Sequence, residues 1–190
     1  MKELDLARLR SNLLSDDLEV KITAVDQACQ LVQEIISAVM QMFEEGPERF
    51  LIAERLPRLG PTIIEPLETM VIESKESEVQ VLAALVLLQL GSKTGVGKLL
   101  EAVEVGNTYE LLIVRLLAAN KVNELIDKII DRLRKTETSK IDLIVGFLSA
   151  LLTLKAKVPA DLMQRFAQPS MPWQIRTVTE EISLSSATTS

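Results

Sequence analysis

Residues 74–91, SKESEVQVLAALVLLQLG, begin as a charged turn and continue as a long apolar run. Only two polar residues interrupt that run, Gln80 and Gln89. A weaker copy of the pattern, SDDLEVKITAVDQACQL, lies at residues 15–31. Repetition of this kind is typical of proteins built from stacked structural repeats, because each repeat buries its apolar face against its neighbours.

The composition of the chain favours helices over strands. The sequence has 190 residues, of which 47% are hydrophobic but only 3% aromatic, with seven glycines and seven prolines. Residues with high helix propensity, such as Leu, Ala, Glu and Lys, are common. We therefore expect an all-α fold.

The charge and the N-terminal sequence restrict the partners and the location of the protein. The formal net charge is −6, whereas binding to nucleic acid requires many Lys and Arg side chains that displace phosphate counterions. No apolar run reaches the roughly 20 residues that span a bilayer, and the N-terminal MKELDLARLR lacks the apolar core of a signal peptide. We expect a cytoplasmic protein that binds neither nucleic acid nor membrane.

One long helix is expected from about residue 18 to residue 45. Ser15, Asp16 and Asp17 offer N-caps, and apolar residues then recur on one face at alternating steps of three and four. These are Ile22, Val25, Cys29, Val32, Ile36, Val39 and Phe43. Further helices are expected from Pro61, within 74–91, and at 96–104, 109–119, 122–133, 141–154, 159–166 and 173–182, and residues 184–190 are expected to form a disordered tail.

The repeat has a period of about 30 residues. The residues that open the second helix of each copy follow one another at intervals of 29, 30, 32 and 30. They are Glu19, Glu48, Glu78, Glu110 and Lys140. The copy around Glu48 is the weakest, because Pro57 ends its helix early. Two helical runs per period predict a helical solenoid of about five hairpins in a single domain, residues 1–183.

At this point the chain resembles a known family. The segments SDDLEVKITAVDQA and RLGPTIIEPLETMVIESKESEVQVLAALVLLQLG are similar to HEAT repeats, particularly the short HEAT-like repeats of phycobilisome lyase-type and related bacterial proteins. The shared features are the LG…(I/V)xxL first helix, the acidic turn and the EV opening of the second helix. The resemblance covers about residues 4–155 and implies a HEAT- or armadillo-like right-handed solenoid that serves mainly as a binding scaffold.

The chain departs from this family at one position of the second helix. Arg commonly follows the Val of the EV pair in the family. The corresponding residues here are Lys21, Gln80, Leu112 and Asp142. The sequence therefore does not predict a ladder of Asp–Arg pairs beyond the first copy.

The sequence offers little support for catalysis. It contains no histidine and one cysteine, so the commonest general base and the usual nitrogen and sulfur ligands of zinc are missing. Because Cys29 lies on the apolar stripe, we expect a packed core thiol rather than a nucleophile. We expect no catalytic residue, no metal and no cofactor.

Two charged segments have simpler interpretations than ligand binding. The run SKTGVGKL, residues 92–99, is similar to a Walker A loop, but Ser92 stands in place of the first Gly and Leu99 in place of the hydroxyl, so a loop between helices is favoured. A basic cluster is interleaved with acids, which favours a solvated face. Its members are Lys128, Arg132, Arg134, Lys135 and Lys140, with Asp127, Asp131 and Glu137 between them.

The apolar second helices are the main functional clue. They are either covered within the monomer or form an exposed patch that binds a partner. We expect a non-catalytic protein-binding scaffold that uses this surface, with Trp173 and Arg176 suited to an interface. The candidate partner-binding residues are Lys21, Gln80, Leu87, Arg115, Asp142, Trp173 and Arg176. Two alternatives remain: lyase-like handling of bilins or phycobiliproteins, implied only by the resemblance, and a homodimer formed through the same surface.

Overall fold

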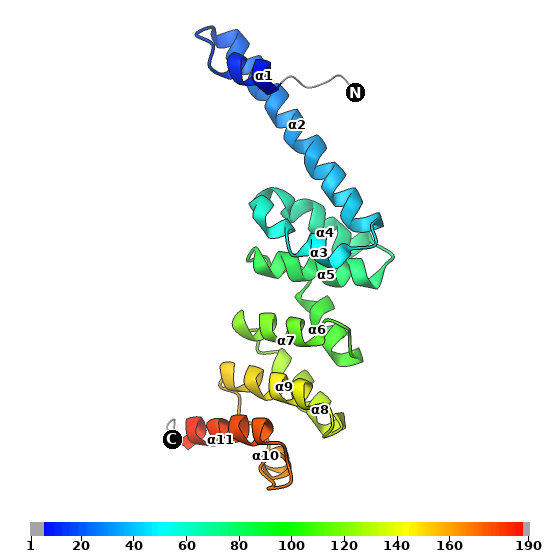
Figure 1. The fold of residues 1–190 in the computed structure, drawn as a ribbon, viewed down its shortest axis with the longest axis vertical. Helices are drawn as coiled ribbons and strands as arrows, with labels where there is room; N and C mark the ends of the chain where they lie inside the picture. The colour runs from blue at the N-terminus through cyan, green and yellow to red at the C-terminus, as the bar shows by residue number, and fades with distance from the viewer. Residues whose placement is uncertain (1–5, 188–190) are drawn as a thin grey trace. The chain divides into compact units, whose positions relative to one another are not determined.

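The computed structural model describes residues 6–187, and every regular element in this range is helical (Figure 1). The all-α prediction is thus confirmed. The elements are α1 (Leu6–Leu13), α2 (Leu18–Glu45), α3 (Arg49–Ala53), the 3₁₀ helix η1 (Leu56–Ile63), α4 (Ile64–Glu73), α5 (Ser77–Gln89), α6 (Val96–Val105), α7 (Glu110–Ala119), α8 (Leu125–Lys135), α9 (Ile141–Thr153), α10 (Ala160–Phe166) and α11 (Trp173–Ala187). The chain forms two compact units, the first ending at Ile52 and the second beginning at Ala53.

The first unit contains the long helix predicted from the sequence. Asp17 caps the N-terminus of α2, because its carboxylate accepts hydrogen bonds from the backbone N–H groups of Glu19 and Val20. At the other end, the guanidinium of Arg49 donates to the carbonyl of Glu44 at 2.7 Å and 3.1 Å. These contacts satisfy backbone groups that the helix leaves unpaired at its ends. Helix α1 packs against α2.

The apolar stripe of α2 is covered along only part of its length. Ile36 and Phe43 are buried, but Ile22 and Val32 are exposed. Cys29 is exposed as well, so the prediction of a packed core thiol is wrong. The reason is tertiary, because an apolar stripe is buried only where another element lies against it.

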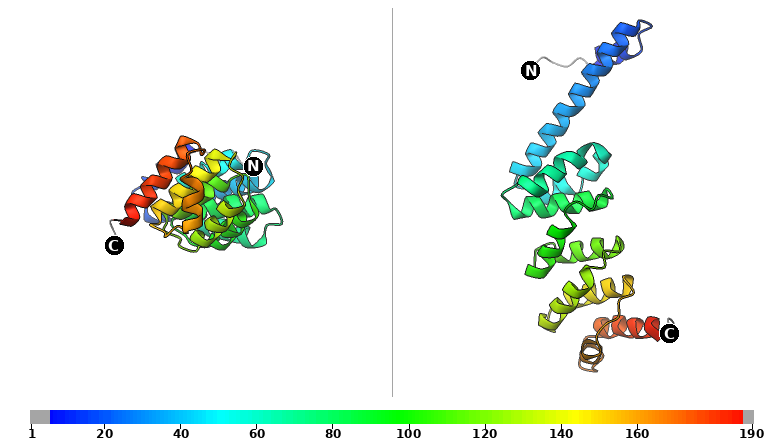
Figure 2. Two further views of the ribbon diagram at one scale, coloured as in Figure 1. Left: turned by 90° about the horizontal axis from the view of Figure 1, so that it is seen from below. Right: turned by 180° about the vertical axis from the view of Figure 1, so that it is seen from behind.

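The second unit consists of helix pairs (Figure 2). Within residues 53–187, α4 contacts α5, α6 contacts α7, α8 contacts α9 and α10 contacts α11. The second helices of these pairs also contact one another in order, α5 with α7, α7 with α9, and α9 with α11, and α6 contacts α8. The fully buried side chains come from both helices of the pairs, and include Leu67, Leu82, Leu99, Ile113, Leu125 and Phe147.

The copy of the repeat around Glu48 does not form a regular helix pair. Helices α5 and α7 start at or next to Glu78 and Glu110, and Lys140 precedes α9. The copy around Glu48 instead yields the five-residue α3 followed by η1. Pro57 lacks a backbone donor, and Gly60 has a φ of 68° in the left-handed region, so a continuous α-helix cannot form there. Residues 6–187 thus contain five helix pairs, α1 with α2 in the first unit and four in the second, but the copy around Glu48 forms none of them.

Helix α5, which carries the apolar run, is almost completely buried. Val79 and all residues of 81–88 are buried, and α5 contacts η1, α4, α6 and α7. The excess of apolar residues in this segment is thus explained by neighbours on several sides. Leu87 is fully buried, so its prediction as a partner-binding residue is corrected.

The last helix runs further than expected. Helix α11 ends at Ala187, inside the range 184–190 for which a disordered tail was predicted, and residues 188–190 lie outside the described part of the chain. Hydroxyl groups near its end donate back to carbonyls of the same helix, Ser183 to Thr179 at 3.1 Å and Ser185 to Ile182 at 3.0 Å. These bonds pair the two hydroxyls with carbonyls of the helix to which they belong.

Candidate partner-binding surface

A shallow groove lies where α4, α5 and α6 meet in the second unit. It consists of two adjoining hollows of about 440 Å³ and about 130 Å³ that share Gln80, Lys98 and Glu101. We call this surface the α4–α6 groove. Its other lining residues are Val71, Ile72, Thr94, Gly95 and Gly97 in the larger hollow, and Ser77, Val81, Ala102 and Val105 in the smaller one.

The groove combines exposed apolar side chains with polar groups. Ile72 is 74% exposed and Val105 is 78% exposed. Gln80 is held in place because its side-chain amide donates to the carbonyl of Ser74 at 2.8 Å. Lys98 and Glu101 form an ion pair at 3.5 Å that is largely open to water, so it stabilises the fold little. Both charges can therefore exchange this pairing for contacts with a partner.

The loop between α5 and α6 forms one wall of the groove. Glu68 of α4 accepts hydrogen bonds from two hydroxyls of this loop, Ser92 at 3.0 Å and Thr94 at 2.7 Å. The carboxylate of Glu68, which lies against this loop, repels phosphate. The loop connects two helices, α5 and α6. The prediction of a helix-to-helix loop in place of a Walker A site is confirmed.

Gly95 brings this loop close to α5. Its φ is +93°, and a Cβ built on it would lie 2.7 Å from the Cβ of Ala84. Glycine is needed at this position for two reasons. Other residues rarely adopt a positive φ, and a side chain would clash with Ala84. The contact between Gly95 and Ala84 thus fixes the position of the groove wall against the buried helix.

The structure does not bring the predicted partner-binding residues together. Gln80 lines the groove, whereas Arg115 is exposed on α7 and Asp142 is exposed on α9. Trp173 is exposed on α11, two helix pairs beyond α7 along the chain. The predicted surface along the second helices is not continuous, because most side chains of α5 are buried.

The remaining predicted residues lie elsewhere. Lys21 is half-buried on α2 and belongs to the first unit. Arg176 is half-buried on α11, and its Nε atom has no hydrogen-bond partner among the described residues. Neither residue contributes to the α4–α6 groove.

The basic cluster of α8 mainly holds neighbouring helices together. Arg132 donates two hydrogen bonds to buried Glu110 of α7, and Lys128 pairs with Glu104 of α6. The hydrogen bond and the charge of Lys128 lower the pKa of Glu104, and the charge of Lys135 lowers it further. The cluster is therefore largely engaged in pairs between helices, which the sequence did not predict.

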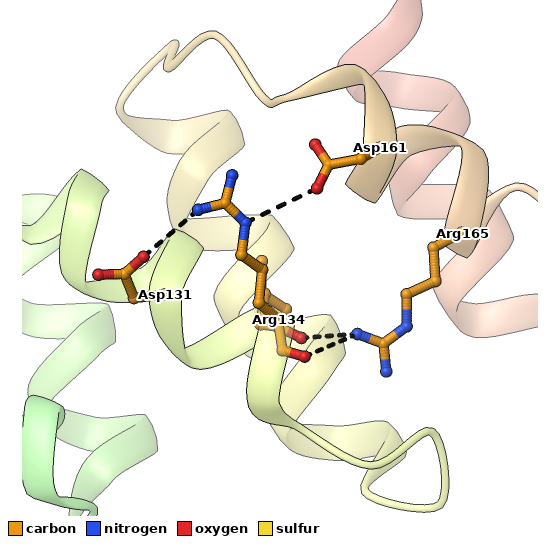
Figure 3. A network of polar contacts seen from close by, with 5 residues as sticks. Asp131, Arg134, Asp161 and Arg165 are labelled. Carbon is orange, nitrogen blue, oxygen red and sulfur yellow. Dashed lines mark hydrogen bonds and ion pairs between the residues drawn. The ribbon is translucent and has the colours of Figure 1, made fainter.

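Helix α8 is also joined to α10 (Figure 3). Arg134 forms ion pairs with Asp131 at 3.5 Å and with Asp161 of α10 at 3.6 Å. Arg165 of α10 donates to carbonyls at the C-terminus of α8, those of Leu133 at 2.9 Å and Thr136 at 2.7 Å. A cation at this end of a helix satisfies its free carbonyls and complements its dipole.

Most residues of the groove were not predicted from the sequence. Ile72 and Val105 are apolar residues that lie off the buried faces of α4 and α6, next to buried Val71 and one turn from buried Ala102. An apolar residue outside the buried face of its helix is a signal that could have found them. Lys98 and Glu101 carry no such signal, because charged pairs are common on exposed helices.

The described residues contain neither a cluster of metal ligands nor a membrane-spanning helix. No group of three or more His, Cys, Asp or Glu side chains in residues 6–187 is arranged to hold a metal ion. No helix in the same range is long and apolar enough to cross a membrane.

Comparisons with protein-family models, with curated proteins and with solved structures find no match for this chain. The resemblance to HEAT repeats therefore rests on the sequence features alone and stays a prediction.

Proposed function

We propose that this protein is a non-catalytic scaffold that binds a protein partner through the α4–α6 groove. In this proposal the second unit is a short HEAT-like, right-handed solenoid, and the groove lies near the N-terminal end of its stacked pairs. The observation that carries the proposal is the exposure of Ile72 and Val105 beside the polar groups of the groove.

The shape of the groove favours a protein segment over a small molecule. Sites for small molecules enclose most of the surface of their ligand and have mainly apolar walls. The α4–α6 groove is shallow, and Gln80, Lys98 and Glu101 line both of its hollows. A peptide segment fits such a surface, because its apolar side chains can cover Ile72 and Val105 while its polar groups pair with the amide and the charges.

The proposal is tested by capture from the native host with matched variants. Ile72→Glu and Val105→Glu place a charge in the groove, whereas Leu184→Glu changes a residue of similar exposure, 71%, on α11. We expect one or more proteins, identified by mass spectrometry, to be captured by the wild type and by Leu184→Glu but lost with both groove variants. All three variants should retain the helix content and melting temperature of the wild type.

Binding should then be measured directly with the purified candidate. We expect the groove variants to raise the dissociation constant at least about tenfold, since each places a charge against apolar surface in the complex. If every captured protein binds the groove variants as well as it binds Leu184→Glu, the α4–α6 groove is not the binding surface.

A further inference from the structure

Helix α2 has a second apolar surface that is separate from the α4–α6 groove. Apolar residues recur along this helix with steps of four and three from its first turn to its last. They are Leu18, Ile22, Val25, Cys29, Val32, Ile36, Val39 and Phe43. Apolar residues that recur at alternating steps of four and three, with a period of seven, form the pattern of the seam of a coiled coil.

The first half of this stripe has no covering element among the described residues. Leu18, Ile22, Val25, Cys29 and Val32 are all exposed, with Ile22 at 54% and Val25 at 48%. We call these five residues the α2 seam. Helix α1 packs against α2, but the buried residue in this half, Ala24, lies on a different face, about 200° around the helix from Ile22. The α2 seam is thus open although its neighbouring face is covered.

The charges beside the seam indicate what covers it. With Ile22 and Val25 at positions a and d of the heptad, Lys21 is at position g and Asp26 at position e of the next heptad. In a parallel pair of helices, a residue at g lies next to the residue five positions later on the partner helix. Lys21 of one chain would therefore meet Asp26 of an identical chain, and the two-fold axis would create this pair twice.

The same charges disfavour the antiparallel arrangement. In an antiparallel pair, e positions face e positions, and the first two e positions of α2 are both acidic, Glu19 and Asp26. Like charges that face each other across an interface are unfavourable. A second copy of the chain in parallel orientation therefore matches the α2 seam in both its apolar residues and its charges.

We propose that two copies of this protein associate through the α2 seam as a parallel, in-register coiled coil. The interface is short, because the later residues of the stripe, such as Ile36 and Phe43, are already buried within the chain. The dimer is therefore expected to be weak and to depend on protein concentration. This association is independent of partner binding at the α4–α6 groove, so either proposal can fail while the other holds.

Cys29 makes the arrangement directly measurable. It is the single cysteine of the chain and occupies an a position of the seam, where a residue of a parallel in-register pair faces its own copy. Mild oxidation of the full-length protein with copper–phenanthroline removes two electrons and two protons from the two thiols and forms one disulfide between chains. We expect a covalent dimer on a non-reducing gel, and a dimer that increases with concentration in sedimentation velocity under reducing conditions.

Matched variants distinguish association through the α2 seam from disulfide formation by random collision of two chains. Val25→Glu places two facing charges in the seam and should slow disulfide formation about tenfold, whereas Gln27→Glu adds the same charge on an exposed face away from the seam. Lys21→Asp and Asp26→Lys should each weaken the dimer, and the double variant should restore it, because the exchanged charges can pair again. Circular dichroism should show equal helix content in all variants, since the altered side chains are exposed or half-buried in the monomer.

Three results would overturn the proposal. The first is a wild type that stays monomeric up to submillimolar concentration. The second is a dimer that forms without a Cys29 disulfide, because such a dimer is not parallel and in register. The third is a double charge exchange that fails to restore the association lost in the single variants.

Discussion

Arg132 of α8 and Glu110 of α7 form a two-pronged ion pair, in which Nε and Nη2 of the arginine donate to the two carboxylate oxygens at 2.9 Å and 3.1 Å. The Glu110 side chain is only 8% exposed and that of Arg132 is 24% exposed. The pair joins the second helix of one pair to the first helix of the next. Charge-assisted hydrogen bonds of this geometry are among the strongest in proteins, and a buried carboxylate depends on them.

Replacing Arg132 should therefore destabilise the second unit. Arg132→Met leaves the carboxylate of Glu110 buried without its cation, and we expect the free energy of unfolding to fall by about 3 kcal/mol. Arg134→Met is the matched control, since Arg134 is half exposed and its ion pairs are longer, so the loss should stay below about 1 kcal/mol. Urea unfolding followed by circular dichroism measures both. Equal losses in the two variants would contradict the role of the buried pair.

Gly95 and Gly97, the two glycines that line the groove, should respond differently to the same substitution. Gly95→Ala forces a positive φ on a residue with a side chain and places its Cβ 2.7 Å from Cβ of Ala84, so we expect a loss of about 2 to 3 kcal/mol. Gly97 lies in α6 with open space around it, and Gly97→Ala should be neutral or stabilising by up to about 1 kcal/mol. Thermal melting of the two variants distinguishes them. A neutral Gly95→Ala would show that the loop does not need this close approach.

Tyr109 should titrate above the ordinary range for tyrosine. Its hydroxyl donates to the carboxylate of Glu78 at 2.7 Å, and this hydrogen bond, with smaller contributions from burial and from the negative charge, raises the pKa of Tyr109. Because Tyr109 is the single tyrosine, absorbance at the tyrosinate band reports it alone. We expect a midpoint above about 10, and Glu78→Gln should return the midpoint toward that value.

The same shift sets the direction of the pH dependence of stability. A folded-state pKa above the unfolded value means that the folded state binds the proton more tightly. The contribution of Tyr109 is therefore fully present below the unfolded pKa of about 10 and is lost as the pH rises through the folded pKa. An unchanged midpoint in the Glu78→Gln variant would show that the carboxylate does not cause the shift.

Arg165 should be important for the attachment of α10. Arg165→Met removes the hydrogen bonds to the carbonyls of Leu133 and Thr136, and we expect a loss of about 2 kcal/mol because bonds from a charged donor are stronger than neutral ones. Gln164→Met, at the exposed neighbouring position, should change stability little. Hydrogen exchange measures the effect locally, with faster exchange in α10 for the Arg165 variant alone. Unchanged exchange there would contradict this role.

Much of the helical architecture could be predicted from local patterns. The apolar stripe and the cap at Asp17 predicted α2 within a residue of its observed ends, and the run after Glu78 predicted α5. Apolar periodicity and capping are properties of neighbouring residues, so they can be recognised without a tertiary structure. The α4–α6 groove could not be predicted in this way, because Ile72, Gln80 and Lys98 come from three different helices.

Leu87 and Cys29 show what local sequence patterns cannot predict. Both lie on apolar faces of predicted helices, but Leu87, predicted to bind a partner, is fully buried, and Cys29, predicted to be packed in the core, is exposed. Local sequence patterns are enough to show that these segments are helices and which of their residues are apolar. Which of these faces is covered depends on tertiary contacts, because a face is buried where another part of the chain lies against it, as α6 and α7 do against α5.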